Sequence, residues 1–206
     1  MFLDFVRAKS RKKKLKQRIK KPKSIDMKYD VMIIGSGPGG YVAAVRAAQL
    51  GFNTAVVERE NLGGICLNWG CIPTKALLKS AQAYNYIKHS ADYGVQIEGS
   101  FKADMNAIVD RSRGVSANMG KGVAHLMQKN NITVIEGEAK LTADRKVSVN
   151  MKDGSGEQLF EADHIILATG ARSRNLPNMP QDGKKIIGYR EAMTLREQPN
   201  SMVVVG

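Results

Sequence analysis

Two cysteines, the only ones in the chain, are the residues whose type and spacing most directly suggest chemistry. Cys66 and Cys71 lie in the glycine-rich segment "GGICLNWGCIPTK", residues 63–75. A regular helix would hold residues five apart beyond the Cα separation of about 4.4–6.8 Å that a disulfide needs. Gly70 allows an irregular turn between them, and a thiol near a helix N-terminus has a lowered pKa. We therefore interpret the pair as redox-active and held within bonding distance.

Other interpretations of the two cysteines carry less weight. A structural disulfide that closes so short a loop would contribute only roughly 2 kcal/mol to stability. A zinc site is a poor alternative because C-x₂-C pairs are missing, so we predict no metal. The three histidines are scattered along the chain and read as ordinary residues: His89, His125 and His164. Free, buried and inert thiols remain an open alternative.

A glycine pattern upstream of the cysteines predicts a dinucleotide site. Gly35, Gly37 and Gly40 form G-x-G-x-x-G, in which the first glycine makes a turn, the second lets a pyrophosphate approach, and the third packs helix on strand. Glu58 ends the next apolar run, where an acid can bind ribose hydroxyls. An ordinary turn with a surface glutamate is the alternative. The neighbouring dithiol favours FAD over NAD, because a flavin can accept two electrons from a dithiol and pass hydride to nicotinamide.

Strands and helices that alternate along the chain must position these residues. Apolar, partly β-branched runs predict buried strands at 29–35, 53–60, 132–139 and 164–170, helical spacing predicts helices at 41–51, 74–89 and 102–130, and residues 146–162 predict a hairpin around Asp153 and Gly154. This alternation implies an α/β, Rossmann-like FAD-binding domain with a parallel sheet, helices on its face and a β-hairpin or meander insertion. We expect it to be incomplete at the C-terminus.

The net charge of +13 is concentrated at the N-terminus and argues against a nucleic-acid-binding domain. Residues 1–28 hold twelve Lys or Arg and two Asp, whereas the remainder is nearly balanced. Such a block is usually solvated, so we predict a basic, disordered leader over residues 1–26, before a well-patterned segment that begins at Met27. No apolar run approaches the roughly 20 residues of a membrane span. Two cysteines fit a reducing compartment, so we expect the cytoplasm, with the mitochondrial matrix as the alternative.

The cysteine segment, extended to "GGICLNWGCIPTKALL", closely resembles the active-site segment of the dihydrolipoyl dehydrogenases, within class I of the pyridine nucleotide-disulfide oxidoreductase family. The resemblance runs from about Met27 to Gly206 and includes "GEAKL" (137–141) and "ATGARSR" (168–174). Glutathione and mercuric reductases usually show V-N-x-G-C-V-P, and this chain departs from them at Leu67, Ile72 and Thr74. The resemblance implies oxidation of protein-bound dihydrolipoamide, with electrons passing through the disulfide and FAD to NAD. A related disulfide reductase and a non-catalytic cofactor-binding fragment are the alternatives.

By position, the same resemblance implies roles for single residues. Cys66 corresponds to the thiol that exchanges with dihydrolipoamide, Cys71 to the charge-transfer thiol against the flavin, and Lys75 to a cation near the flavin N5. The implied cofactor-binding residues are Gly35, Gly37, Pro38, Gly39, Gly40, Glu58, Arg59, Gly64, Cys66, Lys75, Ala139, Thr169 and Gly170. Of these, Gly37 to Gly40 would bracket the pyrophosphate. Ala139 and Thr169 could instead be simple strand residues.

Length is where the chain departs from the family. We expect residues 27–176 to be the N-terminal part of the FAD domain. Residues 177–206 would be a linker and the first strand, "SMVVVG", of a truncated NAD-binding domain. The resemblance implies that a full-length protein adds the NAD site and a dimerisation domain with a His-Glu base, and that it serves lipoyl domains of 2-oxo acid dehydrogenase or glycine cleavage complexes as a homodimer. We expect this chain to be a fragment or a truncated gene product, inactive alone, with an open sheet edge.

Overall fold

Helices and strands alternate through the described residues, which in this computed structural model are 24–205. In chain order the elements are β1 (Ser24–Ile34), α1 (Pro38–Gln49), β2 (Thr54–Glu58), α2 (Gly64–Trp69), α3 (Cys71–Lys88), the 3₁₀ turn η1 (Ser90–Tyr93), α4 (Met105–Lys129), β3 (Thr133–Leu141), β4 (Val147–Met151), β5 (Glu157–Leu167) and α5 (Tyr189–Ala192). Most of the predicted leader lies outside these residues, and β1 begins at Ser24, ahead of Met27. The domain boundaries stay predictions.

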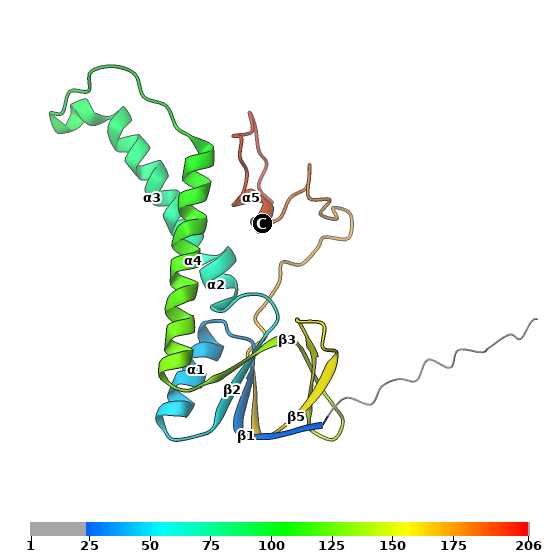
Figure 1. The fold of residues 1–206 in the computed structure, drawn as a ribbon. Helices are drawn as coiled ribbons and strands as arrows, with labels where there is room; N and C mark the ends of the chain where they lie inside the picture. Colours follow the sequence, from blue (N-terminus) through cyan, green and yellow to red (C-terminus); the bar gives the residue numbers. More distant parts are fainter. Residues whose placement is uncertain (1–23, 206) are drawn as a thin grey trace, which may run out of the picture.

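The sheet is mixed and centres on β1. β1 runs parallel to β2 and β5, and β2 runs parallel to β3. β3, β4 and β5 then form an antiparallel meander, so that the five strands close a ring of pairings. This architecture is visible at the base of the molecule in Figure 1. The predicted α/β class and the hairpin between β4 and β5 are confirmed.

Alternation of side chains along β1 explains its unbroken apolar run. Met32 and Ile34 point into the ring, where they join the cluster Tyr29, Ala55, Val57, Ile135, Val147, Val149 and Phe160. Val31 and Ile33 point the opposite way, toward the helices, and join Ala44, Val56, Leu67, Val123, Met127 and Ile132. Because successive side chains face opposite sides of a strand, a strand buried on both sides must be apolar throughout. This double core fixes the sheet edge that carries the glycine turn.

Two predicted strands differ from the structure. Residues 164–167 of β5 form a strand but not a buried one, since Ile166 is 40% and Leu167 61% exposed. Within the described residues they pair with β1 alone, because the pairing with β4 ends at Phe160. The five strands close a ring, so the expected open edge is wrong for the sheet as a whole; among the described residues, this end of β5 lacks a second neighbouring strand. Residues 201–205 form no strand at all, and Val203 is 89% exposed, since no strand among residues 24–205 lies beside them to pair with.

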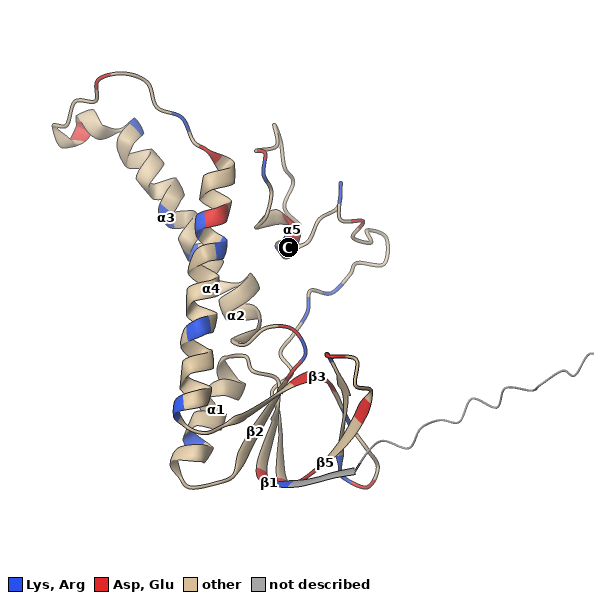
Figure 2. Cartoon of the chain, in the orientation of Figure 1, with Lys and Arg blue, Asp and Glu red and all other residues tan. Residues whose placement is uncertain are grey.

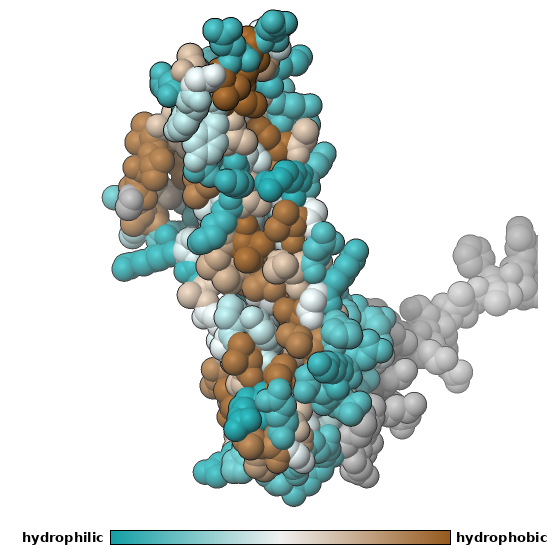
Figure 3. All heavy atoms as spheres, turned by 90° about the vertical axis from the view of Figure 1, so that its left-hand side faces the viewer, coloured by the Kyte–Doolittle hydropathy of each residue, from teal (hydrophilic) through white to brown (hydrophobic). Residues whose placement is uncertain are grey.

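A helical arm, formed by α3 and the N-terminal half of α4, projects from the sheet (Figure 1). Asp104 caps α4 by accepting a hydrogen bond from the Ala107 amide at 3.1 Å. The far end of the arm exposes several large apolar and aromatic side chains, among them Tyr86, Tyr93, Val95 and Ile97. Figure 3, viewed from the side of the helices, shows hydrophobic and hydrophilic residues mixed on this face of the molecule. Ring pairs form there between Tyr84 and Phe101 and between Tyr86 and Tyr93. None of the helices in residues 24–205 is long and apolar enough to cross a membrane.

Candidate functional site: the glycine turn and the cysteine pair

The glycine turn joins β1 to α1 and leaves the start of α1 open. A Cβ atom on Gly40 would lie 1.9 Å from the Gly35 carbonyl oxygen, so only glycine lets the helix come this close to the strand. No atom lies within 4 Å of the Cβ position of Gly37, the N-cap residue, and the first turn of this 12-residue helix carries no acid. Free N–H groups and the helix dipole at such an end favour a phosphate group.

Glu58 lies at the end of β2 and its carboxylate faces the glycine turn. Its Oε2 atom accepts hydrogen bonds from the Ser36 amide at 3.0 Å and the Ser36 hydroxyl at 2.6 Å, and Oε1 accepts from the Glu60 amide at 2.8 Å. The Gly63 amide in turn donates to the Ser36 hydroxyl at 3.2 Å. Ser36 therefore connects Glu58, the glycine turn and the segment that leads to the cysteines. Sequence analysis missed this role, although Ser36 lies inside the glycine motif.

A cavity of about 410 Å³ lies between the glycine turn and the cysteine segment. Ten of the predicted cofactor residues line it: Gly35, Gly37, Pro38, Glu58, Arg59, Gly64, Cys66, Ala139, Thr169 and Gly170. Gly39, Gly40, Lys75 and Cys71 do not line it. A second, polar cavity of about 810 Å³ shares Arg59, Arg172 and Arg190 with the first. Arg172 and Arg190 were not predicted, although Arg172 belongs to the quoted "ATGARSR" segment.

The cysteines lie on two helices separated by Gly70. Cys66 is in α2, half-buried, and Cys71 is the first residue of α3, exposed. A Cβ atom on Gly70 would lie 3.0 Å from the Ile65 carbonyl oxygen and 3.3 Å from the Cys66 Cα, so a side chain there would press the helices apart. The predicted irregular turn at Gly70 is confirmed. The sulfurs are not bonded in this structure, and their disulfide stays a prediction.

The sequence matches the family model described as pyridine nucleotide-disulphide oxidoreductase over residues 29–206, which include the whole of this site. The chain belongs to this family. A dihydrolipoyl dehydrogenase of Rhizobium etli is 53% identical over 191 residues, which cover 86% of this chain and 40% of that protein. Mitochondrial dihydrolipoyl dehydrogenase 1 of Arabidopsis thaliana is 42% identical over 179 residues, covering 86% and 35%.

Solved structures agree with the family assignment. The crystal structure of LpdA from Mycobacterium tuberculosis matches with a TM-score of 0.72 at 25% sequence identity, covering 81% of this chain and 37% of that one. The chain thus spans about two fifths of the length of the curated relatives it matches. The part of the chain that the family model matches contains both the glycine turn and the two cysteines.

The surroundings of Cys66 raise the pKa of its thiol. A hydrogen bond between the two thiols raises the pKa of Cys66, burial raises it further, and the nearby charge of Cys71 acts the same way. The positive charge of Lys75 opposes this rise. At Cys66 these opposing causes give a net rise in the pKa. Lys75 is exposed in the first turn of α3 and acts on Cys66 through its charge.

Proposed function

We propose that this chain is the N-terminal, FAD-binding and redox-disulfide portion of a dihydrolipoyl dehydrogenase-type enzyme. One observation carries the proposal: Cys66 lines the same 410 Å³ cavity as Gly37 and Glu58, and only Gly70 separates its helix from the helix that begins with Cys71. The dinucleotide motif and the thiol pair thus belong to one site. The similarity to dihydrolipoyl dehydrogenases over this part of their length supports the same function.

The residues present fit FAD. The N–H groups at the start of α1 and the open space at Gly37 would hold the pyrophosphate. The Glu58 carboxylate would bind the ribose, exchanging some of its hydrogen bonds with Ser36 for ribose hydroxyls. Ala139, Thr169 and Gly170, which line the same cavity, would also contact the cofactor. When bound, FAD supplies hydride transfer to NAD, whose site we assign to the full-length protein.

The cysteine pair would carry the thiol chemistry. A thiolate of dihydrolipoamide attacks Cys66 of the disulfide, forms a mixed disulfide and releases Cys71 as the thiolate. The second thiolate of the substrate then attacks the substrate sulfur of the mixed disulfide. The oxidised lipoyl disulfide is released, and Cys66 remains on the protein as a reduced thiol. Two electrons now reside on the pair. The raised pKa of Cys66 favours keeping one proton there, hydrogen-bonded to Cys71, and the charge of Lys75 stabilises the accompanying negative charge.

Partners and compartment follow from the same proposal. The substrate would be a lipoyl domain of a 2-oxo acid dehydrogenase or glycine cleavage complex, and the full-length protein a homodimer. The exposed apolar end of the arm, around a hollow of about 480 Å³ lined by Tyr86, Tyr93 and Ile97, is suited to contact a second copy. We assign the chain to the cytoplasm. The mitochondrial matrix is the alternative, since a plant relative is named mitochondrial.

An assay of substrate choice tests the proposal. NADH-dependent reduction of lipoamide, glutathione disulfide and mercuric ion should be compared on this chain and on a version extended downstream with a homologous NAD-binding and dimerisation region. We expect lipoamide reduction by the extended version only, and FAD binding by both. Preferential reduction of glutathione disulfide or mercuric ion would instead favour a related reductase. FAD binding without any turnover in the extended version would favour a non-catalytic fragment.

A further inference from the structure

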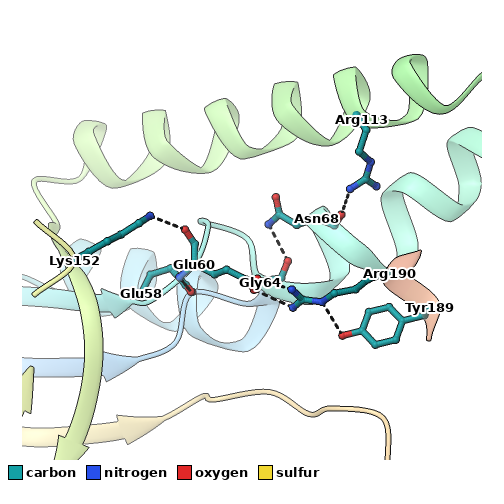
Figure 4. Close-up of polar contacts among 8 residues, drawn as sticks. All are labelled: Glu58, Glu60, Gly64, Asn68, Arg113, Lys152, Tyr189 and Arg190. Carbon is teal, nitrogen blue, oxygen red and sulfur yellow. Dashed lines mark hydrogen bonds and ion pairs between the residues drawn. The ribbon is translucent and has the colours of Figure 1, made fainter. Parts of the chain in front are cut away.

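Trp69, the only tryptophan of the chain, lies between the two cysteines and is contacted by two arginines from distant segments. The guanidinium carbon of Arg113 lies 4.7 Å from the ring centroid and that of Arg190 lies 5.0 Å from it. Both distances fall within the range of cation–π contacts. Arg113 comes from α4 and Arg190 from α5 (Figure 4), so the ring joins three elements at the cysteine segment.

Arg113 depends on this ring more than on hydrogen bonds. Its Nη1 donates to the Asn68 carbonyl at 2.7 Å, but its Nε and Nη2 atoms are buried and without a hydrogen-bond partner. Desolvation lowers the pKa of Arg113. A buried guanidinium in this state gains most from the negative face of an indole ring. The contact therefore holds α2 against α4.

Arg190 is fixed from the opposite end by a carboxylate. Its two terminal nitrogens donate to the two oxygens of Glu60 at 2.5 and 2.9 Å, a bidentate pair. Met193 lies three residues after Arg190 in the sequence. Its sulfur is 4.0 Å from the hydroxyl oxygen of Thr74, in the first turn of α3. The segment 189–194 thus touches α2 through Trp69 and α3 through Thr74. These are the two helices that carry the cysteines.

We propose that Arg113 and Arg190 are positioning residues for the cysteine pair, acting through Trp69. The inference rests on the proposed redox function. Cys66 and Trp69 are three residues apart on α2 and share a helix face, so fixing the ring also fixes the direction of the Cys66 side chain. Asn68 pins the same helix by donating to the Leu62 and Gly64 carbonyls. With α2 held, the thiols stay in contact, which raises the effective concentration of one thiol at the other.

The disulfide equilibrium of the 206-residue chain tests this role. Wild type and variants are equilibrated in glutathione buffers of graded ratio, alkylated, and the oxidised fraction is read by mass spectrometry. We expect Arg190→Gln and Arg113→Gln to lower the equilibrium constant for disulfide formation by roughly two- to tenfold, and Arg190→Lys to restore part of it. Arg196→Gln is the matched control, because Arg196 anchors the same C-terminal segment to Asp110 and Asn106 instead.

Fluorescence of the single tryptophan shows whether the contact itself was lost. Quenching by acrylamide should be weak in wild type and Arg196→Gln, and stronger in Arg190→Gln and Arg113→Gln. Circular dichroism checks folding. If Arg113→Gln unfolds, the Arg190 variants decide, because Arg190 is only half-buried. The positioning role is wrong, but the proposed function stands, if the equilibrium constant for disulfide formation stays unchanged in variants whose Trp69 fluorescence is more strongly quenched. A wild-type chain that forms no disulfide at any ratio overturns the proposed function together with it.

Discussion

At the scale of single residues, the proton on Cys66 gives a direct test of the thiol contact. Its pKa is raised first by the hydrogen bond to Cys71, so at a fixed pH near 8.5, an ordinary thiol value, less of it is thiolate. In Cys71→Ala that cause disappears, and the pKa of Cys66 should fall. Alkylation of Cys66 by iodoacetamide should then be faster at this pH. An alkylation–pH profile that stays in place or moves upward would contradict the contact.

The disulfide itself is a second prediction at this scale. Cys66 and Cys71 should form an intramolecular bond in air, because Gly70 brings their helices together. Mass spectrometry of alkylated peptides should show the linked pair in air and two labelled thiols after dithiothreitol. Cys71→Ala, which leaves one thiol, controls for bonds between molecules. Two freely alkylated cysteines in the oxidised, folded chain would falsify the pairing.

Residue roles were predictable where they rest on local backbone. Gly40 and Gly70 follow from the close approaches that their motifs require, and Glu58 from its place at the end of β2. Arg190 was missed because its partner Glu60 is 130 positions away in sequence. Neither segment contains a motif that would predict an ion pair between them. The raised pKa of Cys66 was not predicted either, for a similar reason. It depends on a contact between two sulfurs, which spacing alone does not establish.

At the scale of elements, the packing of α1 on β1 gives a mutation with a matched control. Gly40→Ala would place a Cβ atom 1.9 Å from the Gly35 carbonyl oxygen, so the helix or the turn must shift. We expect a loss of roughly 1–3 kcal/mol in the free energy of unfolding, by the cost of overpacking, and weaker FAD binding. Gly114→Ala in α4 meets no atom within 4 Å and should stabilise the chain by about 0.5–1 kcal/mol. Urea unfolding measures both, and equal effects would contradict the packing.

Elements were predictable from periodicity, but their burial was not. The strands and the long helices 71–88 and 105–129 follow from their patterns. The apolar runs at 164–167 and 201–205 predicted buried strands as well. In the first, however, Ile166 and Leu167 are exposed, and the second forms no strand. A strand is buried only when neighbours cover it, and a run of apolar residues does not say whether those neighbours are present.

At the scale of the whole molecule, the positive charge is concentrated toward the N-terminal end of the sequence. Positive and negative residues are mixed over the described residues (Figure 2), whereas residues 1–28 carry twelve of the 32 basic residues. Deleting residues 1–23 keeps β1 intact from Ser24 and should leave FAD binding unchanged. It should also remove most affinity for polyanions, which in the intact chain should fall steeply with salt. Loss of FAD binding on deletion would mean that the leader belongs to the fold.

The most direct test of a single flavin and thiol site is the absorption spectrum of the chain loaded with excess FAD and titrated with dihydrolipoamide. Cys66 lines the cavity and Cys71 does not, so the charge-transfer role that the family resemblance implies for Cys71 needs its thiolate to reach the flavin once the disulfide is reduced. A long-wavelength charge-transfer band should then appear, absent in Cys71→Ala and retained in Arg196→Gln. A spectrum that dihydrolipoamide leaves unchanged, or a band that persists in Cys71→Ala, would contradict the shared site.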